Sequence, residues 1–245
     1  MITLLSLLAS LFAQADPVDP APAEVPEADR GLVVVELFTS QGCPMCPDAN
    51  ALLEELDAYG GVVAIAYGVG WWDMYGWADE FARPEFAERQ QAYVEAGEAM
   101  RVFTPHFVVN GSPEKMRFSP EAVRAAVVGA PALTFALSAE DGAVRLDGPP
   151  RETPARLWRV EYVPGAQTRA IAGGANAGRS MTHFNMAGAI TALGDWSGGA
   201  LSLEVAPPAP GEAAVVLVQD GPGGRLLGAV RLEPAEQADL ANEAD

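Results

Sequence analysis

The feature that most constrains the fold is a pair of cysteines between a strand-like and a helix-like segment. Residues 32–38 are almost continuously apolar and β-branched, which is typical of a strand buried on both faces. Cys43 and Cys46, the only cysteines, follow after a short polar loop, and residues 46–59 have helical spacing. A helix N-terminus stabilises a thiolate. The sequence therefore predicts a thiol–disulfide redox site where a strand turns into a helix.

The two cysteines are expected to play different roles. In a C-x-x-C motif at a helix start, the first sulfur is the more exposed and lies nearer the free N–H groups, so Cys43 is the expected nucleophile. Cys46 lies one turn inside the helix and is the expected resolving thiol. The alternative is a static disulfide, although a bridge across so short a loop constrains the unfolded chain little.

An α/β domain is expected over residues 31–130. A second apolar run at 62–67 follows the helix, and the order strand, helix, strand predicts two parallel strands. A helix is expected over 84–98, a strand over 102–109 and a further helix over 119–129.

The pattern becomes all-β after residue 130. Short alternating segments separated by turn signals predict strands at 133–137, 144–146, 157–162, 201–205, 215–218 and 226–232. We therefore expect residues 131–234 to form a second, β-rich portion that resembles a small sandwich.

The N-terminus has the features of a secretory signal. Residues 2–12 are apolar and Ala13-Gln14-Ala15 is a cleavage site, so residues 1–15 are expected to be removed; an uncleaved anchor is the alternative. Residues 16–30 are rich in Pro, Ala and acidic residues and predict a disordered tether. Residues 235–245 form an acidic tail. The mature protein is expected in the periplasm or outside the cell, without a membrane span.

The charge of the chain limits its partners. With 15 basic and 33 acidic residues, the formal net charge is −18. An acidic protein of this kind repels nucleic acid and anionic lipid headgroups, so no nucleic-acid partner is expected.

Two further segments are expected near the cysteines. In Thr104-Pro105, Pro105 is either a cis-proline that contacts the cysteine pair or an ordinary proline of an edge strand. The aromatic loop from Trp71 to Trp77 either forms an apolar wall for a peptide substrate, with Trp72 and Trp77 in contact with it, or covers the core.

Residues 34–47, VVELFTSQGCPMCP, resemble the opening of the DUF1223 family, whose members are exported proteins with a thioredoxin-like fold and no established activity. The resemblance continues through Thr104-Pro105 and Val109-Asn110-Gly111 to residues 176–185 and 193–196. It implies that Pro105 is the cis-proline and lies beside Cys43. It also implies that the β-rich half is a fused portion of the protein and not a second catalytic unit.

The two histidines, His106 and His183, are candidate functional residues. His106 follows Pro105 and is expected to contact substrate; with Cys43 and Cys46 it would offer three ligands for copper(I). Strand alternation, however, predicts that His106 points away from its neighbour. His183 is expected to be a hydrogen-bonded structural histidine.

Together these observations predict a thioredoxin-like α/β protein with a β-rich C-terminal portion that catalyses thiol–disulfide exchange. Cys43, Cys46 and Pro105 are the expected catalytic residues, and Thr104, Trp72, Trp77 and His106 are expected to bind substrate. The expected partner is a thiol- or disulfide-bearing polypeptide or a small thiol, and no cofactor or resident metal is expected. The alternatives are a binding or assembly protein with a static disulfide and a copper-handling protein.

Overall fold

The computed structural model describes residues 31–97, 99–113 and 118–234. The expected signal peptide, tether and acidic tail lie outside the described residues. Among the residues described, no helix is long and apolar enough to cross a membrane. The helices are α1 (Cys46–Asp57), α2 (Pro84–Glu95) and α3 (Pro120–Val128), with short 3-10 helices η1 (Gly70–Tyr75) and η2 (Gly174–Asn176). The strands are β1 (Val33–Thr39), β2 (Val62–Gly68), β3 (His106–Val109), β4 (Ser112–Pro113), β5 (Leu137–Glu140), β6 (Ala143–Leu146), β7 (Ala155–Ala170), β8 (Ser180–Trp196), β9 (Leu201–Glu204), β10 (Ala213–Gln219) and β11 (Leu226–Leu232).

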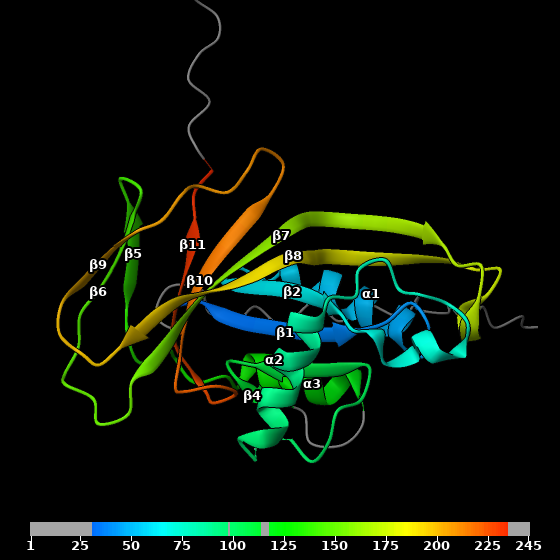
Figure 1. Cartoon of the computed structure of the whole chain (residues 1–245), viewed down its shortest axis with the longest axis horizontal. Coiled ribbons are helices and arrows are strands. Elements are labelled where there is room, and N and C mark those ends of the chain that lie inside the picture. Colours follow the sequence, from blue (N-terminus) through cyan, green and yellow to red (C-terminus); the bar gives the residue numbers. More distant parts are fainter. Residues whose placement is uncertain (1–30, 98, 114–117, 235–245) are drawn as a thin grey trace, which may run out of the picture.

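A mixed sheet of eight strands dominates this α/β structure, in the order β11-β10-β7-β8-β2-β1-β3-β4 (Figure 1). The predicted strand, helix, strand unit is confirmed, because β1 and β2 pair in parallel from Val33–Val62 to Thr39–Gly68. β3 then runs antiparallel to β1. The unit brings the loop that carries both cysteines to the carboxyl end of β1.

Every residue of β1 is buried, because helices cover both of its faces. Val33, Val35 and Leu37 pack with α1 and α3, whereas Val34 and Phe38 pack with α2. Alternate residues of a strand point to opposite faces, which explains why this run lacks the apolar–polar alternation of a half-exposed strand.

The β-rich half agrees only in part with the expected sandwich. Four of its strands, β7, β8, β10 and β11, extend the same sheet that contains β1. Only β5, β6 and β9 form a second sheet, which packs on β10 and β11 through Leu137, Val144 and Val216. The sequence did not predict β8, because this strand is rich in Ala, Gly and Thr and gives a weak apolar pattern.

The β7–β8 hairpin is much longer than a typical strand pair, with 16 and 17 residues. One end of the hairpin pairs with β10, and the other end reaches past α1 (Figure 1). The hairpin therefore carries residues of the C-terminal half to the cysteine loop.

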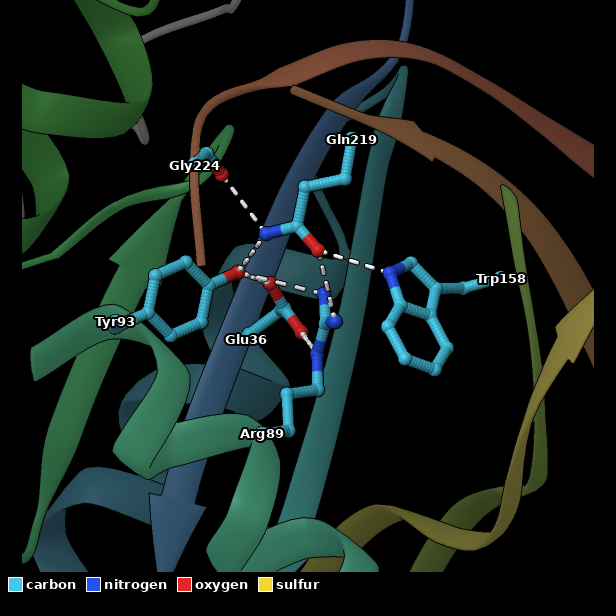
Figure 2. Close-up of polar contacts among 6 residues, drawn as sticks. All are labelled: Glu36, Arg89, Tyr93, Trp158, Gln219 and Gly224. Atoms are coloured by element: carbon cyan, nitrogen blue, oxygen red, sulfur yellow. Dashed lines mark hydrogen bonds and ion pairs between the residues drawn. The ribbon is translucent and has the colours of Figure 1, made fainter. Parts of the chain in front are cut away.

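A buried polar network joins the two halves on the α2 face of the sheet (Figure 2). Arg89 of α2 donates from Nε to Glu36 of β1 over 2.6 Å, and the hydroxyl of Tyr93 donates to the other carboxylate oxygen over 2.6 Å. Gln219 of β10 accepts from Arg89 and from the indole of Trp158 in β7. Although burial disfavours a charged guanidinium, the Glu36 carboxylate raises the pKa of Arg89.

Candidate functional site

The cysteines lie in a tight turn between β1 and α1. The backbone N–H of Cys43 donates to the carbonyl of Ser40, and the N–H of Cys46 donates to the carbonyl of Cys43. Cys46 is the first residue of α1, and Pro47 occupies the first turn, where its missing N–H removes no helical hydrogen bond. Cys43 therefore lies just outside the helix N-terminus, as expected.

Several donors stabilise the thiolate form of Cys43. The thiol of Cys46 donates to the Cys43 sulfur, which lowers the pKa of Cys43 most strongly. Burial opposes this effect, while the hydroxyl of Thr104 and the backbone N–H groups of Met45 and Cys46 lower the pKa further. The resulting pKa of Cys43 is about 7.

The pKa of Cys46 is shifted in the opposite direction. Its burial raises its pKa well above the ordinary value, and the hydrogen bond to Cys43 and the charge on that sulfur raise it further. The hydroxyl of Thr39 partly offsets this by donating to Cys46. Asn50, one turn further along α1, donates to Thr39 Oγ1 over 2.9 Å and fixes that hydroxyl. The two thiols thus form an asymmetric pair.

Cys43 is nonetheless fully buried, like Cys46, so solvent does not reach the first sulfur more readily than the second, contrary to the expectation from the sequence. Both cysteines pack against Ile171 and Met181, with Trp72 and Trp77 partly buried against the same cluster. Ile171 and Met181 come from either side of the tip of the β7–β8 hairpin, more than a hundred residues along the chain. No local sequence pattern near the cysteines could have indicated this cover.

The Thr104–Pro105 peptide bond is cis, as the resemblance implied. The hydroxyl of Thr104 forms a hydrogen bond with the Cys43 sulfur. Trp72 donates from its indole Nε1 to Thr104 Oγ1 over 2.7 Å. The structure therefore brings Cys43, Cys46, Thr104 and Trp72 together, and Pro105 follows Thr104 directly in the chain.

The aromatic loop has two parts. Trp77 joins the site from another side, because its Nε1 donates to Oε1 of the buried Gln41 over 2.8 Å. Trp72 and Trp77 are half-buried over the cysteines, whereas Met74 and Tyr75 are 81% and 64% exposed. The loop thus both covers the sulfurs and presents an apolar rim to solvent.

The structure does not bring His106 to the cysteines. Its ring is buried on the α2 face, bonded to Gln90 Nε2 and packed against Phe38 and Phe103. Within residues 31–97, 99–113 and 118–234, no three His, Cys, Asp or Glu side chains form a group that could hold a metal ion.

His183 differs from the hydrogen-bonded histidine that the sequence predicted. It is 1% exposed, and in the described part of the chain neither ring nitrogen has a hydrogen-bond partner. Its ring meets Phe81 edge-on, with the centroids 4.9 Å apart. Burial lowers the pKa of His183 to about 4, with a smaller contribution from the charge of Arg169.

Sequence reasoning missed the role of Asn176. This residue is fully buried, and its Nδ2 donates to the carbonyls of Gln41 and Cys43 over 2.9 and 2.8 Å. It lies in a Gly-rich segment without a helical or strand pattern. Only its place within the segment that resembles the family could have indicated it.

The residues that form this site fall within a match to a known family. Residues 34–219 match the family model described as "Protein of unknown function (DUF1223)". The chain belongs to the DUF1223 family. Its fold is similar to the crystal structure of a protein from Agrobacterium tumefaciens, with 26% identity, a TM-score of 0.64 and coverage of 87% of this chain and 99% of that one.

A second solved structure is similar to this chain in its fold only. HBP35 of Porphyromonas gingivalis is 15% identical to this DUF1223 chain, with a TM-score of 0.56 and coverage of 88% of this chain and 79% of that one. No curated protein matches the chain.

Proposed function

We propose that this chain is an exported, thioredoxin-like thiol–disulfide exchange protein that uses Cys43 as nucleophile and Cys46 as resolving thiol. The observation that carries the proposal is the asymmetric placement of the pair: Cys43 lies just outside the N-terminus of α1 and accepts hydrogen bonds from the Cys46 thiol and the Thr104 hydroxyl, whereas Cys46 is buried inside the helix start. This placement lowers the pKa of Cys43 to about 7 and raises that of Cys46. An attacking thiol reacts best when its pKa is near the ambient pH. The nucleophile of thioredoxin also titrates near pH 7.

The reaction follows from these two protonation states. The Cys43 thiolate attacks one sulfur of a substrate disulfide, which forms a mixed disulfide and releases the other substrate sulfur as a thiolate. Cys46 then loses its proton to solvent and attacks the Cys43 sulfur, which releases the second substrate thiolate. The substrate gains two electrons, and the protein is left with a Cys43–Cys46 disulfide. The reverse sequence oxidises a dithiol substrate.

Thr104 and Trp72 support this chemistry as positioning residues. The hydroxyl of Thr104 accepts from Trp72 and donates to Cys43, so its proton is oriented toward the reacting sulfur. The partner is a thiol- or disulfide-bearing polypeptide or a small thiol, in the oxidising compartment that the signal-like N-terminus indicates.

The reduction potential of the pair tests the proposal. We expect equilibration with glutathione or dithiothreitol to give a potential above about −300 mV, the range of pairs that exchange readily. Disulfide exchange should also be lost in Cys43→Ser and should stop at a trapped mixed disulfide in Cys46→Ser. A potential well below that value, without exchange, would contradict the proposal.

A second candidate, a binding or assembly protein with a static disulfide, is favoured by one observation: neither cysteine is exposed. Under that function the pair resists reduction, and Cys43→Ser leaves partner binding intact. The same potential measurement therefore separates the two functions.

A further inference from the structure

A loop from the C-terminal half closes over the cysteine turn. This cover loop comprises residues 171–179, between β7 and β8. Asn176 links this loop to the backbone of the cysteine turn, because its amide group uses both N–H donors on the carbonyls of Gln41 and Cys43. The Oδ1 atom of Asn176 in turn accepts from Arg179 over 3.2 Å, which orients the amide.

Gly42 of the cysteine turn contacts both the cover loop and Trp72. A Cβ atom on Gly174, whose φ is +69°, would be in ordinary van der Waals contact, 3.7 Å from the Cα of Gly42 and 3.5 Å from the Cβ of Trp77. A Cβ atom on Gly42 would lie only 2.6 Å from the Cβ of Trp72, so Gly42 leaves no room for a side chain there. The cysteine turn is therefore held between Trp72 and the cover loop, which explains why Cys43 has no exposed surface.

We infer that Asn176 is a specificity-determining residue, which keeps the cover loop closed over Cys43 and lets it open more readily to a disulfide within an extended polypeptide than to a small disulfide. This inference rests on the proposed exchange function. It names the substrate class: a segment of polypeptide with free backbone N–H groups on either side of a cysteine.

The reason lies in the two carbonyls that Asn176 occupies. When the cover loop opens, the carbonyl of Gln41 loses the Asn176 donor and the carbonyl of Cys43 keeps only the N–H of Cys46, so two hydrogen bonds are lost, which costs free energy unless they are replaced. A small disulfide approaches the sulfur without replacing both donors. An extended polypeptide can supply backbone N–H groups to both carbonyls, as in strand addition.

The surface around the cover loop suits the same substrate. Met45, Met74 and Tyr75 are 51%, 81% and 64% exposed. Tyr75 packs against Trp72, with the ring centroids 5.6 Å apart. Exposed apolar side chains beside a reactive group are typical of a surface that binds apolar segments.

Two probes that share one leaving group test the inference. An apolar peptide with a single cysteine and N-acetylcysteine amide are each prepared as the mixed disulfide with thionitrobenzoate. The Cys43 thiolate attacks the cysteine sulfur of the probe and expels coloured thionitrobenzoate, so both rates are read by absorbance. Both rates are measured for the wild type, Asn176→Ala and Asn176→Ser at a pH well above the pKa of Cys43, so that its thiolate fraction is the same in all three proteins. Thr182→Ala is the control, because it removes only the exposed contact with Thr168 on the same hairpin.

We expect the wild type to react with the peptide about tenfold faster than with the small probe. In Asn176→Ala the rate with the small probe should rise about tenfold, since two hydrogen bonds that hold the loop closed are lost. Asn176→Ser should be intermediate and Thr182→Ala unchanged. Equal rates with both probes in the wild type, or a ratio that Asn176→Ala leaves unchanged, would overturn the inference.

Alkylation separates this inference from the proposed function. Iodoacetamide labels Cys43 without any redox step, and its rate should also rise about tenfold in Asn176→Ala. If Asn176→Ala is alkylated faster but the protein shows no catalytic exchange, Asn176 does keep the cover loop closed over Cys43, and the proposed exchange function is wrong. If Asn176→Ala does not fold, amide hydrogen exchange of residues 173–177 in the Cys46→Ala protein should accelerate when the peptide is trapped on Cys43; unchanged protection would contradict opening.

Discussion

Trp72 and Thr104 form a hydrogen bond that orients a hydroxyl toward the Cys43 sulfur. The indole Nε1 of Trp72 donates to Thr104 Oγ1 over 2.7 Å, so the proton of that hydroxyl is free to point at Cys43. The two residues come from η1 and from the segment before β3, which meet only in the folded chain. The tertiary structure thus contributes to the protonation state of the cysteine.

Replacing Thr104 with Val keeps the shape of the side chain and removes this donor. Because the hydroxyl stabilises the Cys43 thiolate, we expect the pKa of Cys43 to rise from about 7. Near pH 7 the rate of iodoacetamide labelling should fall about fivefold. Thr168→Val, on the exposed face of β7, is the control and should leave the labelling profile unchanged. A Thr104→Val profile that overlays the wild type would show that the hydroxyl does not act on Cys43.

Removal of the Cys46 thiol should raise the pKa of Cys43 more than removal of the Thr104 hydroxyl, because the hydrogen bond from Cys46 is the main cause of the lowered pKa of Cys43. In reduced wild-type protein we expect Cys43 labelling to be half-maximal near pH 7, with Cys46 labelled more slowly at every pH below 9. Cys46→Ala should move the Cys43 midpoint upward. Peptide mass mapping after timed labelling distinguishes the two sites, and faster labelling of Cys46 would reverse their roles.

The buried ion pair of Figure 2 predicts a large effect on stability. Arg89→Leu leaves the fully buried Glu36 carboxylate without its cation, which should lower the free energy of unfolding by about 3–5 kcal/mol. Arg124→Leu is a matched control, because Arg124 also contacts a glutamate, Glu55, over 2.6 Å but both side chains are about 40% exposed. It should cost less than about 1 kcal/mol.

Urea unfolding gives the free energy of unfolding of Arg89→Leu and of Arg124→Leu. A Glu36→Leu/Arg89→Leu double variant should recover part of the loss, since no charge then remains buried. If Arg89→Leu and Arg124→Leu lower the free energy of unfolding equally, the buried Glu36–Arg89 pair is no more important for stability than the exposed Glu55–Arg124 pair.

The strand, loop and helix around the cysteines could be predicted from sequence because local patterns determine them. Residues 32–38 are apolar without alternation, and Pro47 and the spacing of α1 mark the helix start. The parallel pairing of β1 with β2 follows from the helix that connects them. These features need no information from the rest of the chain.

The cover over the cysteines could not be predicted in this way. Asn176, Ile171 and Met181 reach the site only because the β7–β8 hairpin extends the sheet past α1. That hairpin has many small residues and a weak apolar pattern, so strand β8 was missed. Which carbonyl a distant amide contacts depends on the register of both strands, which no local pattern specifies.

His183 predicts a pH dependence of stability. Its pKa in the folded protein is about 4, below the ordinary value of 6.5, because the ring is buried against Phe81 and near Arg169, whose partner is Glu80. Between these two pH values the unfolded chain binds a proton at His183 and the folded chain does not. The free energy of unfolding should therefore fall as the pH decreases from 6.5 to 4, by up to about 3 kcal/mol from this residue alone.

Replacing His183 with Phe removes the titrating group and keeps an aromatic ring beside Phe81. Other groups also titrate in this range, so the relevant quantity is the difference between the two proteins in urea unfolding at several pH values. We expect the wild type to lose stability relative to His183→Phe as the pH falls below 6.5, with the difference levelling off near pH 4. Above pH 7 the difference should be constant. Curves that stay parallel from pH 7 to pH 4 would mean that His183 accepts a proton in the folded protein as readily as in the unfolded chain.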